Sequence, residues 1–162
     1  MLTPRRLYRT LALAEVVTWT LLLLGMVAKY VLHLGELGVR VGGGIHGVVF
    51  LAYCLATVLV GVDARWGAGR VLLGLVSAVV PYATVPFERH VEGRGLLPDT
   101  WRLRGTHSAA TDTTARTPQG VLDRAVALFL RRPVPALIAS VVAIAVMFSL
   151  LLLAGPPTQW GR

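Results

Sequence analysis

The chain has 162 residues, of which 55% are hydrophobic and only 15% are charged, and its formal net charge is +8. Average soluble domains carry about 25% charged residues, so this composition excludes an ordinary water-soluble domain. The arginines flank long apolar stretches, where they are expected to contact anionic lipid headgroups. We therefore expect membrane lipids, and no nucleic acid, among the partners.

Four long apolar segments predict an all-α membrane protein with four transmembrane helices. A spanning helix needs about 20 predominantly apolar residues. The segments cover residues 11–32, 45–62, 71–87 and 134–155. We expect the first three to form a three-helix core within a membrane domain at 1–90, and the fourth to be a separate C-terminal span. A signal peptide is the competing interpretation of the first segment, but that segment is too long and no Ala-x-Ala cleavage site stands at its end.

The second half of the chain is predicted to hold four further parts. Residues 91–117 are rich in Ser, Thr, Gly and Arg, which is typical of a polar, mobile connector. An amphipathic surface helix is expected at 118–132, with Thr117 as its N-cap. The fourth transmembrane helix follows at 134–155, and residues 156–162 form a tail.

The histidine at position 46 directly follows three glycines and opens the second apolar segment. In an antiparallel bundle whose second helix begins there, His46 lies at the level of Lys29, and Glu15 lies roughly 20 Å away along the axis. A third helix would bring Glu88 up to the histidine. The sequence therefore predicts a polar cluster of Lys29, Tyr30, His46 and Glu88, and leaves Glu15 as a carboxylate at the opposite face.

Each member of this cluster also has a purely structural interpretation. Lys29 can extend to the headgroups, Glu88 can end a helix, and His46 can hydrogen-bond a backbone carbonyl. Ionisable groups within membrane spans are rare and more often functional than elsewhere. The sequence leaves both interpretations open.

Small residues predict where helices approach one another closely. Gly43 and Gly47 stand four apart, next to Gly44, and Gly74 and Ala78 repeat this small-xxx-small spacing in the third segment. This spacing lets the backbones of membrane helices come into contact.

The sequence shows no pattern typical of an enzyme or a metal site. His33 and His46 are the only local pair of potential ligands, and no zinc-binding spacing is present. There is no nucleophile–base set, phosphate loop or dinucleotide fingerprint. Cys54 has no partner for a disulfide and is expected to be a small buried hydrophobe. We expect a non-enzymatic protein without metal or cofactor.

Several motifs in residues 5–90 resemble those of the YdzA-like family of small bacterial integral membrane proteins, grouped as a domain of unknown function. The motifs are Glu15, Lys29-Tyr30, Gly44-x-His46-Gly47, Pro81 and Phe87-Glu88. The resemblance implies a compact helical membrane domain and supplies no reaction.

Three functions remain after these exclusions. The first is an accessory or scaffold protein of the bacterial inner membrane, associating with other membrane proteins or with itself. The alternative is a small transporter or proton-coupled permease component that uses Lys29, His46 and Glu88. A lipid-binding regulator is a third, less supported option. The arginines before the first segment favour a cytoplasmic N-terminus, whereas three spans would put the connector arginines on the opposite side.

Overall fold

The computed structural model describes residues 3–104 and 124–128, together with residues 135, 138–139, 141–143, 145–146 and 149–150. Throughout this described part the regular structure is helical. Its elements are α1 (Pro4–Tyr30), α2 (Leu37–Asp63), α3 (Ala68–Val79), α4 (Thr84–Gly93) and the short 3-10 helix η1 (Arg102–Arg104).

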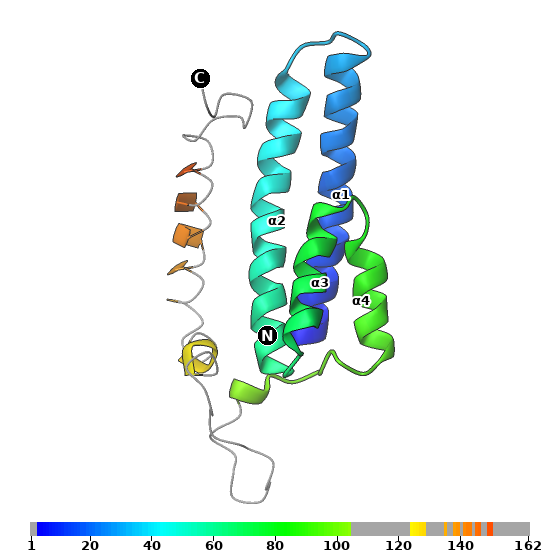
Figure 1. The fold of residues 1–162 in the computed structure, drawn as a ribbon. Coiled ribbons are helices and arrows are strands. Elements are labelled where there is room, and N and C mark those ends of the chain that lie inside the picture. Colours follow the sequence, from blue (N-terminus) through cyan, green and yellow to red (C-terminus); the bar gives the residue numbers. More distant parts are fainter. Residues whose placement is uncertain are drawn as a thin grey trace, which may run out of the picture.

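Helices α1 and α2 form a long antiparallel pair (Figure 1). The side chain of Thr3 caps α1 by accepting the backbone N–H of Arg6, and Pro4 occupies the first turn, where its missing N–H costs nothing. Each helix has 27 residues, or about 40 Å at 1.5 Å per residue. Both are long and apolar enough to cross a membrane, whose hydrocarbon core is about 30 Å thick.

The two helices touch backbone to backbone at three glycines. A Cβ added to Gly25 would lie 2.6 Å from the carbonyl carbon and oxygen of Gly38, and one added to Gly42 would lie 3.0 Å from the Leu21 carbonyl oxygen. Gly38 and Gly42 are one turn apart, so both face α1. This contact fixes which residues of α1 lie opposite which residues of α2.

Helix α2 begins eight residues earlier than the apolar segment suggested, at Leu37 rather than near residue 45. The chain reverses within residues 31–36, where His33 and Gly35 adopt positive φ angles of 53° and 89°. The glycine-rich stretch before His46 is therefore part of α2, and its Gly42 makes the close contact with α1.

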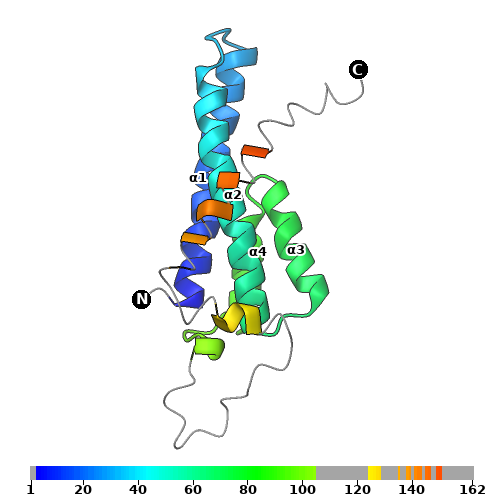
Figure 2. The same cartoon turned by 90° about the vertical axis from the view of Figure 1, so that its left-hand side faces the viewer.

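The predicted third span at 71–87 is not one helix but a short hairpin. Helix α3 has 12 residues, about 18 Å, which is too short to cross the bilayer core. The chain turns at residues 80–83, where Pro81 keeps Val80 extended and Tyr82 has a φ of 65°. Helix α4 then runs back, so α3 and α4 cover only the half of α1 and α2 that holds the N-terminus (Figures 1 and 2).

Side chains and backbone of this hairpin are tied to α1 by hydrogen bonds. The Trp19 indole N–H donates to the carbonyl of Ala78 over 3.3 Å, and the Thr84 hydroxyl donates to the carbonyl of Ala12 over 3.0 Å. Irregular backbone at membrane depth requires such cover, because lipid offers no hydrogen bonds. The side chains of Trp19 and Thr84 thus hold the α3–α4 hairpin against α1 on either side of its turn.

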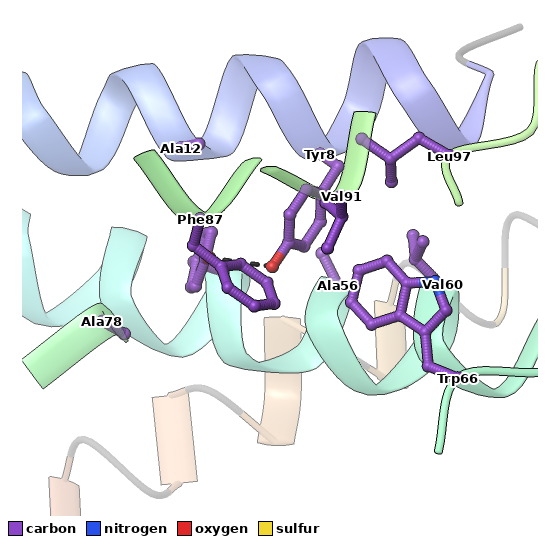
Figure 3. Close-up of a cluster of buried hydrophobic side chains, with 10 residues drawn as sticks. Tyr8, Ala12, Ala56, Val60, Trp66, Ala78, Phe87, Val91 and Leu97 are labelled. Carbon is purple, nitrogen blue, oxygen red and sulfur yellow. Dashed lines mark hydrogen bonds between the residues drawn. The ribbon is translucent and has the colours of Figure 1, made fainter. Parts of the chain in front are cut away.

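The larger cluster of buried hydrophobic side chains is formed by residues from α1, α2, α3 and α4 together with Trp66 and Leu97 (Figure 3). Tyr8 and Phe87 each meet Trp66 edge-on, with ring centroids 5.7 and 6.0 Å apart, and Val60 and Val91 complete the packing.

Outside this core, large apolar side chains are exposed along the outer faces of the helices. Examples are Leu13, Val17, Leu21, Leu24, Val41, Val48, Leu72 and Val76. Such continuous apolar exposure is unfavourable in water and matches contact with lipid.

Part of residues 91–104, which were predicted to begin a mobile connector, packs against the helices instead. Val91, Leu97 and Leu103 are buried. The Asp63 carboxylate, at the end of α2, accepts the backbone N–H groups of Arg102 and Leu103 over 3.2 and 2.9 Å. The rest of the predicted connector, at 105–117, lies outside the described residues.

The predicted C-terminal elements are described only in part. Of the surface helix at 118–132, residues 124–128 are described; they are helical, with Val126 and Ala127 buried near Leu103. Of the span at 134–155, the described positions are helical and exposed, and the others, like the tail at 156–162, lie outside the described residues. The structure thus contains two long apolar helices and one shorter apolar helix among its described residues, and four spans remain a prediction.

The glycine contact predicts a sharp difference between two Gly-to-Ala substitutions. In Gly25→Ala the new methyl group meets backbone at 2.6 Å, so α1 and α2 must separate, and we expect a loss of about 1–3 kcal/mol, as for overpacked cores. Gly44→Ala is the matched control, because a Cβ there meets nothing within 4 Å. Unfolding of both variants in detergent micelles measures the difference, and equal stabilities would contradict the close contact.

Candidate functional site

The structure does not bring the predicted Lys29, His46 and Glu88 cluster together. Lys29 Nζ lies 2.8 Å from Glu36 Oε1, in the loop between α1 and α2, and 5.2 Å from the centroid of the exposed Tyr30 ring. This hydrogen bond from Lys29 holds the pKa of the Glu36 carboxyl below its usual range. Lys29 and Tyr30 therefore belong to the loop end of the hairpin.

Glu88 lies towards the other end of the molecule, because α4 runs back towards the N-terminus. Its side chain is buried, and its charged neighbours are Glu92, Arg9 and Arg89. The prediction that Glu88 reaches the level of Lys29 is therefore wrong. It assumed a third helix that continues past Pro81 across the membrane.

The expectation that Glu15 and His46 lie far apart is also wrong. His46 Nδ1 is 3.4 Å from Glu15 Oε2, and the Glu15 side chain is fully buried. The early start of α2 carries His46 about 12 Å deeper, at 1.5 Å per residue. In addition, Gly25 rather than Tyr30 lies opposite Gly38, so α1 extends beyond the start of α2.

Three neighbours surround this pair. The Thr18 hydroxyl is 3.2 Å from His46 Nδ1 and donates to the backbone carbonyl of Glu15 over 3.1 Å. The Trp19 ring packs on the imidazole with centroids 4.4 Å apart, and the Phe50 ring lies 6.1 Å away. The imidazole is thus flanked by two aromatic rings and contacts one hydroxyl.

A second polar group, made of hydroxyls, lies closer to the N-terminal end. The Tyr8 hydroxyl is 2.8 Å from that of Tyr53 and 3.2 Å from that of Thr57, and Tyr53 in turn reaches the Ser77 hydroxyl at 3.1 Å. These four side chains are buried and link α1, α2 and α3. Each hydroxyl is paired, as buried polar groups generally are.

The predicted packing residues have different environments. Ala78 is fully buried, and a Cβ on Gly74 would come within 2.8 Å of Thr57, so both lie where α3 meets its neighbours. Gly43 makes only an ordinary contact with α1, Gly44 faces open space, and Gly47 is half-buried. The closest approach of α1 and α2 uses Gly38 and Gly42 instead.

The described residues contain no group of three or more His, Cys, Asp or Glu side chains arranged to hold a metal ion. Cys54 is half-buried and has a free thiol. What the site offers chemically is therefore one carboxyl–imidazole pair and a set of paired hydroxyls.

Comparison with known proteins identifies a family and one relative. The model of the domain of unknown function DUF3817 matches residues 5–92, close to the 5–90 range of the predicted resemblance. The Streptomyces coelicolor protein named "Putative membrane protein SCO5905" is 40% identical over 94 residues, which is 57% of this chain and 11% of that protein. The match therefore spans about one ninth of the relative's length. No solved structure matches the chain.

The hydroxyl cluster predicts that Tyr8→Phe destabilises the fold. The substitution keeps the ring and removes the hydroxyl that contacts Tyr53 and Thr57, so we expect a loss of about 0.5–1.5 kcal/mol. Tyr30→Phe is the control, because that ring is 64% exposed. Thermal unfolding in micelles provides the comparison, and a Tyr8→Phe variant as stable as the control would contradict a structural role for the cluster.

Proposed function

Because the chain belongs to the DUF3817 family, an uncharacterised family of membrane proteins, we propose its role from its own geometry. The proposed role is that of a non-enzymatic accessory or scaffold domain in the bacterial inner membrane. It associates with other membrane helices, either from different proteins or from further copies of this chain. The YdzA-like label given to residues 5–90 is part of this proposal.

The uneven cover of the α1–α2 pair is the observation that carries the proposal. Helices α3 and α4 pack beside one half, and in both views the other half of the pair projects beyond them (Figures 1 and 2). On that projecting half, Leu24 and Val27 of α1 and Val41 of α2 are exposed, and the open Gly44 lies close by on α2. Small residues allow a further helix to approach closely there.

The relative gives independent support for a modular role. The matched stretch makes up only 11% of a much longer protein that is named as a membrane protein. A domain that occurs within a longer chain is suited to anchoring or assembling other parts. This argument applies to the present chain only as part of the proposal.

The fold also favours one orientation. Because α3 and α4 return, the start of α1 and the ends of α2 and α4 share one end of the molecule. The arginines near this end are Arg5, Arg6, Arg9, Arg65, Arg70, Arg89, Arg94 and Arg102. Within the described residues the opposite end carries Lys29 and Arg40. The positive-inside rule therefore supports a cytoplasmic N-terminus, with the arginines near anionic headgroups.

The transporter alternative loses its predicted site. It required Lys29, His46 and Glu88 to meet, and the structure places them at different levels, with Lys29 paired to Glu36. A proton-linked role would have to use the Glu15–His46 pair instead.

The orientation predicts which loops an impermeant thiol reagent reaches. In a Cys54→Ala background, Leu34→Cys should react in intact cells, whereas Thr100→Cys should react only after the cells are opened. Both positions are exposed, and neither substitution removes an arginine. A third helix that crossed the membrane would instead place residues 34 and 100 on the same side, and equal labelling of both in intact cells would contradict the fold.

The accessory role is tested with a photo-crosslinking amino acid at two matched positions in native membranes. Val41 on the projecting half and Val76 on α3 are similarly exposed, at 52% and 48%. We expect a discrete protein adduct from position 41, identified by mass spectrometry, and lipid adducts from position 76. An adduct of twice the mass of the chain would identify self-association, and the absence of any protein adduct at position 41 would contradict the proposal.

A further inference from the structure

The Glu15–His46 pair is an ionisable contact in the interior of the two long apolar helices. Glu15 lies 11 residues after the start of α1 and 15 before its end, which is about 16 and 22 Å. Both carboxylate oxygens of Glu15 are buried without a hydrogen-bond partner, while His46 Nδ1 is 3.4 Å from one of them. A buried carboxyl without a hydrogen bond does not stabilise an apolar core. The protonation state of Glu15 and His46 therefore requires a physical explanation.

The hydrogen-bond pattern around Thr18 indicates where a proton can lie. The Thr18 hydroxyl has one proton and donates it to the Glu15 carbonyl, so its contact with His46 Nδ1 is one in which the hydroxyl accepts. The imidazole then carries its proton on Nδ1. Glu15 Oε2 lies 3.4 Å from the same Nδ1, and no hydrogen bond joins the two atoms.

No other charged group compensates the pair at this level among the described residues. Cys54 of α2 is the titratable neighbour that interacts electrostatically with Glu15. From α3 and α4 the residues tied to α1 here are Ala78 and Thr84, which do not titrate. Glu88 of α4 has Glu92, Arg9 and Arg89 as its charged neighbours instead.

The charge balance of the pair follows from these contacts. A Glu15 carboxylate beside a neutral His46 imidazole has a net charge of −1. Adding two protons gives a carboxylic acid beside an imidazolium, with a net charge of +1. With one added proton it is uncharged overall, either as carboxylic acid and imidazole or as carboxylate and imidazolium. A net charge inside hydrocarbon is strongly unfavourable, so the one-proton state is favoured over the other two.

We propose that Glu15 and His46 form a proton-binding site inside the membrane-spanning pair, which holds one shared proton taken from the aqueous phase. The site goes beyond the accessory role and does not depend on it. Loss of this proton, or uptake of a second, places a net charge where α1 and α2 touch at Thr18 and His46. The site therefore links the packing of the two helices to pH.

The test uses the full chain in nanodiscs of phosphatidylcholine and phosphatidylglycerol. Infrared spectroscopy with ¹³C-labelled glutamate detects a protonated carboxyl, and NMR of ¹⁵N-labelled histidine detects an imidazolium. Signals are assigned with Glu15→Gln and His46→Gln, and Glu88→Gln serves as the control carboxyl. At neutral pH we expect the wild-type pair to show either a Glu15 carboxylic acid or a His46 imidazolium, and not both.

The partner substitutions show whether the proton is shared. If the proton is on histidine, Glu15→Gln should lower the titration midpoint of His46 by about one pH unit or more. If it is on glutamate, His46→Gln should shift the carboxyl band of Glu15. Glu88→Gln should do neither.

Three outcomes would overturn the proposal: a pair with no added proton at neutral pH, a pair with two, or two groups that do not respond to each other's substitution. Circular dichroism verifies that each variant remains helical. Should Glu15→Gln fail that check, the proton count in the wild-type protein and the response of the Glu15 carboxyl to His46→Gln decide the question.

Discussion

The backbone contact between α1 and α2 determines most of what this structure places together. Gly25, Gly38 and Gly42 leave no room for side chains between the two helices, and this fixes their axial register. Given that register, Thr18 lies opposite His46 and Tyr8 lies opposite Tyr53. Polar side chains of one helix therefore meet polar side chains of the other. These contacts provide hydrogen-bond partners, which lipid tails cannot supply.

The short α3–α4 hairpin imposes the second constraint, because it covers only one half of the α1–α2 pair. Its turn is held to α1 through Trp19 and Thr84, and its glycine at position 74 lets α3 approach Thr57. The aromatic core, the hydroxyl cluster and most of the described arginines consequently gather in one half of the molecule. Helices α3 and α4 do not cover the other half, which is why a partner helix is proposed there.

The sequence was sufficient for the helical class and for the two long apolar helices, because apolar length alone indicates them. It did not define where helices end. Residues 37–44 precede the apolar segment at 45–62 and were not included in it, yet Gly38 and Gly42 have the same four-residue spacing that was assigned to Gly43 and Gly47. Likewise Pro81 was visible, but only the turn at Tyr82 shows that the chain reverses there rather than kinks. These two errors in register and direction produced the wrong polar cluster.

The same register explains why a carboxyl can persist between two helices that are otherwise apolar. Apolar contacts do little to favour one helix arrangement over another in lipid, because the surrounding tails are equally apolar. A slip of α2 by one turn would leave Glu15 facing Gly42 or Phe50 instead of His46, with no group able to share its proton. Buried polar pairs are known to select one register at some cost in stability. The proposed proton site and the glycine contact therefore favour the same register of α1 and α2.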